Sequence, residues 1–270
     1  MKNQHLIPKL GFGTYGRNGK EGIDAILCAL ETGYRHLDTA QSYNTEFETG
    51  EALRRSGIAR ADVFMTTKIS TDNFGEGKLI PSLEKSLETM GVDQVDLTLI
   101  HWPAPNGAIP LEVYLSQIAE AQDKGLTRLI GVSNFTIALL QQAESLLGKG
   151  RIVNNQFELN PLMQNKKLAS HCQRNDILVT CYLPIARGTL SSDPVLRSIA
   201  GNHGATVEQV IIAFEHAKGY CAIPTSGRTE RIRSNFAIGK VKLKPQEITL
   251  IEALDRNHRV IDPDWGPDWD

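Results

Sequence analysis

VFMTTKI (residues 63–69) and VDLTLIHWP (residues 95–103) are short, nearly continuous runs of apolar and β-branched residues. Such runs are typical of strands that are buried on both faces, as in the parallel sheets of α/β proteins. Each run closes with a polar side chain, Lys68 in the first and His101 in the second. On both sides of these two runs, segments with the pattern of a buried strand alternate with segments that have the pattern of an amphipathic helix.

Eight candidate strands alternate with helical segments along the whole sequence. Apolar residues recur at i, i+3, i+4 and i+7 within 23–30, 111–118 and 207–214, and Thr206 with Gln209 predicts a capping box at the start of the last segment. The pattern predicts an α/β fold, a (β/α)8 TIM barrel over residues 1–270 as a single domain, with the active site at the C-terminal face of the strands. The strands are expected near residues 10–14, 34–38, 62–67, 95–101, 128–132, 152–157, 178–182 and 221–224.

Two segments depart from the simple alternation. The interval from 182 to 221 is long enough to hold an additional helix. The tail, residues 257–270, is rich in Pro, Trp and Asp, and we expect it to be irregular.

The composition is that of an ordinary globular protein. Hydrophobic residues make up 41% and charged residues 22% of the 270 residues, and the net charge is -2. These values give no indication of a nucleic-acid or membrane partner, and the N-terminal segment lacks an apolar run of signal-peptide length. The cysteines show no metal-ligand spacing, so we expect no metal site, and they are read as reduced thiols of a cytoplasmic protein: Cys28, Cys172, Cys181 and Cys221.

The glycines Gly11, Gly13 and Gly16 match the spacing of a dinucleotide-binding fingerprint, and Asp38 would then be the ribose-binding acid of a doubly wound dehydrogenase. Two features oppose this interpretation. The preceding run contains Pro8, which makes a poor central strand, and helical periodicity begins only after Gly19. The motif is therefore set aside in favour of the barrel.

Four polar residues lie at or just after the ends of consecutive candidate strands. Asp38 ends the second strand, Tyr43 lies in the loop that follows it, Lys68 ends the third strand and His101 ends the fourth. The carboxyl ends of barrel strands are where active sites are built, so these side chains are expected to share one pocket.

The four residue types suit the reduction of a carbonyl group. Hydride addition leaves an alkoxide that needs a proton, which the phenol of Tyr43 could donate. The ammonium of Lys68 would stabilise the phenolate and lower the pKa of Tyr43, and Asp38 would hold Lys68 in place. The imidazole of His101 could donate a hydrogen bond to the substrate oxygen.

The sequence resembles the aldo-keto reductase family over nearly its whole length. The motifs that carry the resemblance follow the order of the family: GFGTY (11–15), GYRHLDTAQSYNTE (33–46), TTKI (66–69), LIHWP (99–103), GVSNF (131–135), NQFELNP (155–161), YLPIARG (182–188) and IPTSGRTERIRSN (223–235). The resemblance implies catalytic roles for Asp38, Tyr43, Lys68 and His101, with NADPH as the cofactor and a monomeric state.

The resemblance also implies the binding residues. Ser133, Asn134 and Gln156 would hold the nicotinamide carboxamide, and Tyr182 would stack on the nicotinamide ring. The adenosine 2′-phosphate would be bound by residues of one short segment: Ser226, Arg228, Arg231 and Asn235. Arginine suits that role because its planar fork of donors matches a phosphate and stays charged.

Within the family, the closest resemblance is to short bacterial members that act on 2,5-diketo-gluconate, methylglyoxal and similar dicarbonyls. Tyr15 stands where many members have a tryptophan, and it is expected to line the substrate pocket with Trp102 and, as an open alternative to simple packing, Trp265 or Trp269. Thr225 stands where the family often has lysine, which weakens the expected preference for NADPH over NADH, although Arg228 could compensate.

Two other residues differ from the family pattern, Thr45 in place of an asparagine and Asn160 in place of a histidine, and we expect both differences to have little effect on function. Two competing functions stay open. A barrel aldolase or isomerase would use Lys68 as a Schiff-base nucleophile, and a non-catalytic binding protein could retain the same fold.

Overall fold

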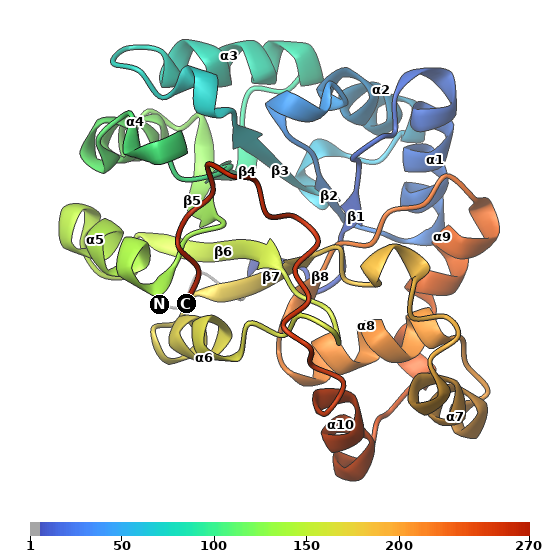
Figure 1. The fold of residues 1–270 in the computed structure, drawn as a ribbon. Helices are drawn as coiled ribbons and strands as arrows, with labels where there is room; N and C mark the ends of the chain where they lie inside the picture. The colour runs from blue at the N-terminus through green and yellow to red at the C-terminus, as the bar shows by residue number, and fades with distance from the viewer. Residues whose placement is uncertain (1–5) are drawn as a thin grey trace.

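Eight parallel strands lie at the centre of the computed structural model, which describes residues 6–270 (Figure 1). Strands that are adjacent in the sequence are adjacent in the sheet. A parallel bridge joins Leu10 to Ala222, and the Gly11 amide donates a 2.9 Å hydrogen bond to the Ala222 carbonyl. The sheet therefore closes on itself, and the predicted barrel is confirmed. The strands are β1 (Phe12–Gly13), β2 (His36–Asp38), β3 (Phe64–Ile69), β4 (Val95–Ile100), β5 (Thr127–Ser133), β6 (Ile152–Glu158), β7 (Leu178–Tyr182) and β8 (Cys221–Ala222).

Helices surround the barrel on its outer side (Figure 1). The capping box predicted for Thr206 and Gln209 is present at the start of α8, and the additional helix predicted between 182 and 221 is α7. The helices of the described chain are α1 (Gly19–Thr32), α2 (Glu46–Ser56), α3 (Leu79–Met90), α4 (Leu111–Asp123), α5 (Ile137–Leu147), α6 (Lys166–Arg174), α7 (Pro194–His203), α8 (Val207–Ala217), α9 (Thr229–Phe236) and α10 (Pro245–Glu252).

The tail beyond α10 has no regular secondary structure, as predicted for residues 257–270. It is the red segment in Figure 1, and it runs from α10 across the open face of the barrel. The tail is thus brought over the end of the barrel at which the carboxyl ends of the strands meet.

Strand side chains alternate between the barrel interior and the surrounding helices. The interior holds a compact apolar cluster that includes Phe64, Leu97, Leu99 and Leu129. The outward-facing residues of the same strands pack with the helices in a second, larger cluster that includes Met65. Because of this alternation, β3 directs Thr66 and Lys68 into the barrel between outward-facing neighbours.

Gly131 shows how tightly the barrel interior is packed. A Cβ atom at this position would lie 2.7 Å from the Asn154 carbonyl oxygen and 2.7 Å from Cδ2 of Leu99. Real Cβ atoms do not approach other atoms this closely, so only glycine permits the observed contact between β5 and its neighbours.

The doubly wound alternative is wrong. The sheet is closed and ordered sequentially, whereas a doubly wound sheet is open with a reversal in strand order. The helix after the glycines begins only at Gly19. The strand β1 has two residues, both paired with β2. Two of the glycines serve close packing in the barrel instead, because a Cβ atom on Gly11 would lie 2.8 Å from the His36 ring and one on Gly13 would lie 2.9 Å from the Ile223 carbonyl oxygen.

Membrane-spanning helices and disulfide bonds are both absent from residues 6–270. No helix is long and apolar enough to cross a membrane. The four cysteines, which were predicted to be reduced thiols, form no disulfide bond. Residues 1–5, the start of the segment that lacks a signal-peptide pattern, lie outside the described part of the chain.

Candidate active site

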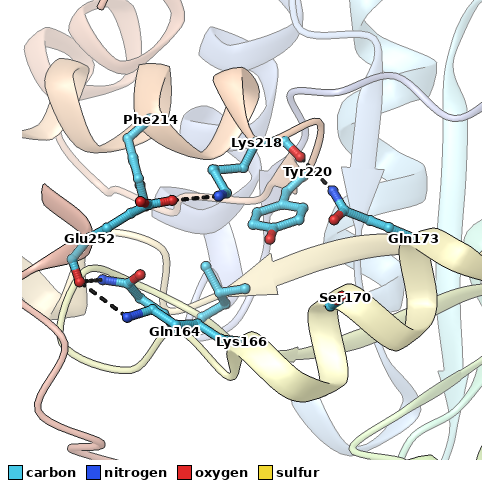
Figure 2. Close-up of a pocket in the computed structure, with 9 residues that line it drawn as sticks. Gln164, Lys166, Ser170, Gln173, Phe214, Lys218, Tyr220 and Glu252 are labelled. Atoms are coloured by element: carbon cyan, nitrogen blue, oxygen red, sulfur yellow. Dashed lines mark hydrogen bonds and ion pairs between the residues drawn. The ribbon is translucent and has the colours of Figure 1, made fainter. Parts of the chain in front are cut away.

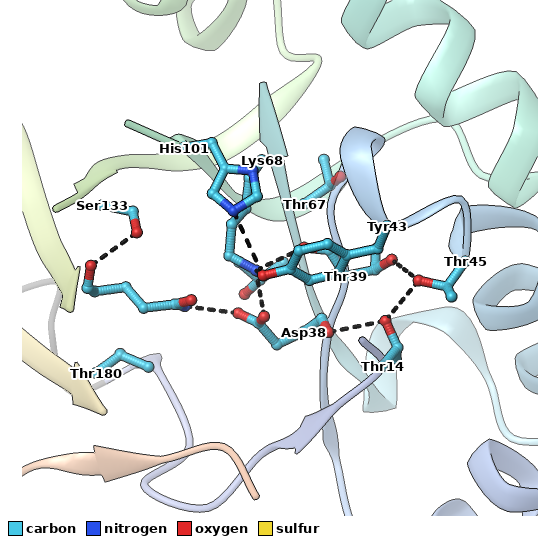
Figure 3. A network of polar contacts seen from close by, with 12 residues as sticks. Thr14, Asp38, Thr39, Tyr43, Thr45, Thr67, Lys68, His101, Ser133 and Thr180 are labelled. Carbon is cyan, nitrogen blue, oxygen red and sulfur yellow. Dashed lines mark hydrogen bonds and ion pairs between the residues drawn. The ribbon is translucent and has the colours of Figure 1, made fainter. Parts of the chain in front are cut away.

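The four residues expected to share a pocket come together at the carboxyl end of the barrel. Asp38 and Lys68 point inward from the ends of β2 and β3, and His101 follows β4 directly. Tyr43 ends the short 3₁₀ helix η2 (Gln41–Tyr43), which follows β2. Figure 3 shows the four side chains converging, with the Lys68 ammonium between the Asp38 carboxylate and the Tyr43 hydroxyl.

Lys68 is completely buried and has three oxygen partners. Its Nζ atom forms an ion pair with Oδ1 of Asp38 and donates a 2.8 Å hydrogen bond to the Thr39 carbonyl. It lies 3.4 Å from the Tyr43 hydroxyl. Burial alone would lower the pKa of Lys68, but the negative charge of Asp38 and the neighbouring Tyr43 raise it above its ordinary value. The ammonium is therefore charged and fixed in position.

The Tyr43 hydroxyl lies between the ammonium and the imidazole. Its oxygen is 3.5 Å from Nε2 of His101, and Nζ of Lys68 is 4.7 Å from the centre of its ring. Burial raises the pKa of Tyr43 above its ordinary value, and the ammonium of Lys68 only partly offsets this effect. The prediction of a lowered pKa is therefore wrong for the protein alone, because the loss of hydration outweighs the attraction of one nearby cation. Tyr43 is a protonated phenol, which is the form that donates a proton.

His101 is a neutral imidazole in this site. Burial and the positive charge of Lys68 lower its pKa to about 3. Its Nδ1 atom is 3.3 Å from the hydroxyl of Ser42. If the serine donates this hydrogen bond, Nε2 carries the proton and can donate toward a substrate oxygen beside Tyr43.

A chain of threonine hydroxyls, which no sequence motif predicted, holds the segment that carries Tyr43. Oγ1 of the buried Thr45 is 2.9 Å from Oγ1 of Thr14 and 3.0 Å from Oγ1 of Thr39 (Figure 3). Gln41 adds a second anchor, because its amide nitrogen donates a 3.1 Å hydrogen bond to the Ser82 hydroxyl on α3. Thr45 thus helps to position the loop that carries Tyr43, a role that was not expected from its occurrence in place of the family's asparagine.

A second group of predicted residues borders the first. Ser133, at the end of β5, donates a 2.8 Å hydrogen bond to the Gln156 carbonyl, and the Gln156 side-chain amide donates a 2.8 Å bond to Oδ2 of Asp38. Asn134 accepts a 2.9 Å hydrogen bond from the Tyr182 hydroxyl. The side-chain oxygen of Gln156 is buried without a partner among the described residues. Because the amide nitrogen of the same group is bound to Asp38, this orphaned acceptor lies close to the Asp38 carboxylate.

The third predicted group is separate from the other two. Ser226 precedes α9, where its hydroxyl accepts a 3.0 Å hydrogen bond from the Arg228 amide. Arg228 and Arg231 are exposed, and Asn235 is buried on the same helix. No hydrogen bond or ion pair joins these residues to Asp38 within the described chain, so they form a distinct polar site on the β8–α9 side of the barrel.

Aromatic residues border the outer side of the mouth. The Tyr15 ring, which is 66% exposed, contacts Tyr43 edge-on with the ring centres 5.1 Å apart. Trp102, which follows His101, packs edge-on against Trp265 at 5.2 Å and Trp269 at 6.1 Å. The tail tryptophans therefore pack onto the barrel and extend the aromatic wall at the same time.

The tail that carries these tryptophans is held by a buried carboxylate that was not predicted from the sequence. Glu158, at the end of β6, accepts hydrogen bonds from the Val260 amide at 3.0 Å and the Ile261 amide at 2.8 Å. At the far end, the Asp270 carboxylate accepts a 3.0 Å bond from the Ile137 amide at the start of α5. Glu158 lies inside the NQFELNP motif (155–161), and this motif is the feature of the sequence that could have pointed to it.

A pocket of about 430 Å³ lies on the outer side of the barrel, between α6, α8 and α10 (Figure 2). Two of its charged side chains, Lys218 and Glu252, form an ion pair at 2.5 Å, and Lys166 pairs with Asp255. None of the predicted site residues lines it. It is therefore separate from the candidate active site. In residues 6–270 no cluster of three or more His, Cys, Asp or Glu side chains could hold a metal ion.

Known proteins share both the sequence and the fold. The model of the aldo/keto reductase family matches residues 9–256. The chain is 43% identical over 265 residues to methylglyoxal reductase DkgB of Yersinia pestis, covering 98% of this chain and 99% of that protein. It is 36% identical over 270 residues to an aldo-keto reductase of Mycolicibacterium smegmatis, covering 99% and 95% of the two chains.

Two solved structures extend the comparison. One is a candidate 2,5-diketo-D-gluconic acid reductase B, with a TM-score of 0.95, 35% identity and coverage of 100% of this chain and 96% of that one. The other is an aldo-keto reductase of Bombyx mori in complex with NADP, with a TM-score of 0.87, 32% identity and coverage of 95% and 92%. Together with the buried Asp38, Lys68 and Tyr43 at the barrel mouth, these matches place the chain in the aldo/keto reductase family.

Proposed function

We propose that the protein is an NADPH-dependent oxidoreductase that reduces small aldehydes, ketones or dicarbonyls to alcohols. The observation that carries the proposal is the placement of a protonated phenol, Tyr43, 3.4 Å from the buried ammonium of Lys68. A phenol in this setting can donate a proton to an alkoxide and leave a phenolate that the ammonium stabilises.

Each of the four residues has a part in the proposed reaction. Tyr43 donates its hydroxyl proton to the oxygen of the reduced carbonyl. Lys68 stabilises the resulting phenolate, and Asp38 keeps the ammonium charged and in place through their ion pair. His101, as a neutral imidazole, donates a hydrogen bond that orients the carbonyl oxygen toward the phenol.

The residues at the barrel mouth fit a nicotinamide cofactor, which would supply the hydride. The buried, unpartnered oxygen of Gln156 is an acceptor for the amide protons of a carboxamide. Ser133 and Asn134 provide further polar atoms beside it. Tyr182, at the end of β7, would cover one face of the nicotinamide ring.

The residues before and within α9 would select the phosphorylated cofactor. Arg228 and Arg231 are exposed guanidinium groups three residues apart, and Ser226 and Asn235 flank them. Guanidinium groups recognise a phosphate through paired donors, so this site suits the adenosine 2′-phosphate. Thr225 supplies no charge, so we expect a real but moderate preference for NADPH.

Small dicarbonyls of the methylglyoxal and 2,5-diketo-gluconate type are the proposed substrates. The relatives named for methylglyoxal and diketo-gluconate reduction cover nearly the whole chain. Tyr15 and Trp102 would form the substrate wall with Trp265 and Trp269. We further propose that residues 1–270 form a single domain and that the protein acts in the cytoplasm as a monomer, which gel filtration would test.

A panel of carbonyl substrates, assayed at 340 nm with NADPH and NADH in parallel, tests the proposed function. We expect turnover with small aldehydes and dicarbonyls and faster turnover with NADPH. Binding of the cofactor without turnover of any substrate would indicate a binding protein. Trapping of a substrate on Lys68 by borohydride, without oxidation of NADPH, would indicate a Schiff-base enzyme.

The variant Tyr43→Phe tests the proton donor. General acid catalysis is typically worth about 10²–10⁴-fold, so turnover should fall by at least that factor. Binding of NADPH, followed by quenching of tryptophan fluorescence, should change little because the hydroxyl is assigned to the substrate. A variant that kept more than about a tenth of the wild-type turnover would remove Tyr43 from this role.

A further inference from the structure

Arg17 lies in the segment between β1 and α1 and has a guanidinium group without a counter-ion. Within residues 6–270, no ion pair or side-chain hydrogen bond joins its guanidinium to another residue, and its buried Nε atom has no partner. Two other partly buried arginines, Arg60 and Arg151, also have an unpartnered Nε, but their guanidinium groups form ion pairs, with Asp96 at 2.7 Å and with Asp123. Desolvating a donor without a partner costs free energy, so Arg17 has a binding capacity that the protein itself does not use.

The backbone of Arg17 is fixed. Its amide donates a 2.9 Å hydrogen bond to the Thr14 carbonyl. A Cβ atom on Gly22 would lie 1.9 Å from the Arg17 carbonyl oxygen, so α1 approaches this residue as closely as a glycine allows. The next residue, Asn18, donates a 2.8 Å hydrogen bond to the Asn44 carbonyl, next to Tyr43. Arg17 therefore projects from a rigid segment that also supports the catalytic loop.

The Arg17 guanidinium lies directly against Gly227. A Cβ atom on Gly227 would lie 2.3 Å from Nη1 and 3.6 Å from Cζ of Arg17, so the guanidinium occupies space that any other residue at 227 would fill. Gly227 stands between Ser226 and Arg228, and α1 and α9 are neighbours in Figure 1. The fold thus brings Arg17 to the proposed 2′-phosphate segment from the opposite end of the chain.

The polar groups around this point lack partners as well. The guanidinium groups of Arg228 and Arg231 make no ion pair or side-chain hydrogen bond in the described part of the chain. Asn235 is only 5% exposed, and its side chain likewise makes no hydrogen bond to a described residue. Arg231 and Asn235 are four residues apart on α9, so they share a face of the helix. Like charges gathered without a counter-ion favour an anionic ligand.

We propose that Arg17 is a ligand of the adenosine 2′-phosphate and a determinant of the preference for NADPH, supplying the cation that Thr225 does not. The inference rests on the proposed function, because it takes the dinucleotide as the ligand. The phosphate is bound between Arg17, held against Gly227, and Arg231 on α9. A planar guanidinium suits this place, since it presents parallel donors to two phosphate oxygens.

The affinity of Arg17→Ala for cofactors and fragments provides the test. Tryptophan quenching gives the dissociation constants of NADPH and NADH, and calorimetry gives those of adenosine 2′,5′-bisphosphate and 5′-AMP. Affinity for the two ligands that carry a 2′-phosphate should fall by on the order of tenfold or more, with little change for the other two. Arg17→Lys, which keeps the charge but loses the fork, should lie between Arg17→Ala and the wild type.

Two reference variants separate the outcomes. Arg231→Ala tests the 2′-phosphate site itself: if neither it nor Arg17→Ala lowers affinity for NADPH selectively, the proposed phosphate site fails. If only Arg231→Ala is selective, the site stands and the inference about Arg17 is wrong. Arg233→Ala removes an equal charge from α9 two residues from Arg231, on another face of the helix, and should leave the preference for NADPH intact.

Gly227→Ala tests the contact between Gly227 and Arg17. The added methyl displaces the end of a flexible side chain, so the variant should fold while moving the guanidinium away. We expect it to reproduce much of the loss of NADPH affinity seen in Arg17→Ala. In the double variant, Gly227→Ala should then add little further loss. Additive losses would show that the methyl blocks the phosphate independently of Arg17 and would overturn the proposed contact.

Discussion

Burial acts in opposite directions on the neighbouring groups of the active site. It raises the pKa of the Tyr43 phenol and lowers the pKa of the His101 imidazole, because in each case the charged form loses hydration. For Lys68, burial would lower the pKa, but the contact with Asp38 reverses the shift. The site therefore holds a neutral phenol, a neutral imidazole and a charged ammonium together at neutral pH.

This set of protonation states predicts a rate of carbonyl reduction that is independent of pH over the neutral range. The imidazole, with a pKa lowered to about 3, stays neutral above pH 5, and the phenol, with a pKa raised above 10, keeps its proton through pH 9. The rate of NADPH oxidation in a single turnover, measured at 340 nm with enzyme in excess over NADPH and with saturating substrate, should show a plateau between these limits.

A loss of rate on the acid side with a midpoint near the ordinary histidine pKa of about 6.5 would contradict the prediction, because it would mean that His101 titrates in the working range. The alkaline limb, where Tyr43 loses its proton, should appear only above the ordinary tyrosine pKa of about 10. Tyr43→Phe should lack this limb, which identifies its source.

Residue types and their spacing made these four positions predictable, because a period of two directs Asp38 and Lys68 to the same side of neighbouring strands. The direction in which the pKa of Tyr43 shifts was not predictable in this way. It depends on the balance between burial and one cation, and burial at a loop position is set by the surrounding fold. Arg17 was missed for a similar reason, since only the closed barrel brings it against Gly227.

At the scale of elements, the most important contact outside the barrel is the attachment of the tail. Strand and helix positions followed from periodicity, but the path of an irregular segment leaves no periodic signal. The path is set instead by point contacts, chiefly the Glu158 carboxylate on the Val260 and Ile261 amides. Stacking of the Arg259 guanidinium on the Trp269 ring, 3.5 Å from its centre, adds to them.

Glu158→Gln should loosen the tail without unfolding the barrel. Hydrogen bonds to a charged group are worth about 1.5–3 kcal/mol each, and the neutral amide presents only one acceptor oxygen where the carboxylate has two. We expect faster hydrogen exchange at the Val260 and Ile261 amides. We also expect the Michaelis constant for the carbonyl substrate to rise more than the dissociation constant of NADPH, because Trp265 and Trp269, which pack on Trp102, are proposed to form part of the substrate wall.

Glu88→Gln provides a matched control, since Glu88 is an exposed carboxylate on α3 whose partner is Lys85. It should alter neither exchange in the tail nor the Michaelis constant. Unchanged exchange at Val260 in Glu158→Gln would show that the tail is held by its aromatic contacts, and the role given to the carboxylate would be wrong.

At the scale of the whole molecule, two apolar layers enclose the strands, one inside the barrel and one between the strands and the helices. Eight alternating strands and helices predicted this arrangement, because a strand buried on both faces needs a layer on each side. The outer layer nevertheless contains an acidic residue that the pattern did not reveal. Glu215 lies among the buried positions of α8, and its two carboxyl oxygens have no hydrogen-bond partner among the described residues.

Glu215 should make the stability of the protein depend on pH. Burial raises the pKa of this carboxyl well above its ordinary value, so the folded protein holds a proton that the unfolded chain releases above about pH 4. Stability is therefore fully present below the ordinary carboxyl pKa and is lost as the pH rises toward the raised pKa of the folded state. The loss contributed by one proton reaches at most about 1.4 kcal/mol per pH unit.

Glu215→Gln keeps the shape of the side chain but removes its ionisation, so the variant should gain stability over the wild type as the pH rises from 5 to 8. Urea denaturation at each pH, analysed for the free energy of unfolding, measures this difference. Glu208→Gln, in the first turn of the same helix, controls for the change in helix charge. The contrary outcome is a free energy of unfolding that differs between Glu215→Gln and the wild type by the same amount at every pH from 5 to 8. That result would mean that the Glu215 carboxyl keeps one protonation state throughout this range in both the folded and the unfolded chain. Because the unfolded carboxylate is ionised there, that result would require an ionised Glu215 in the folded protein as well, and hence a partner for it in solution.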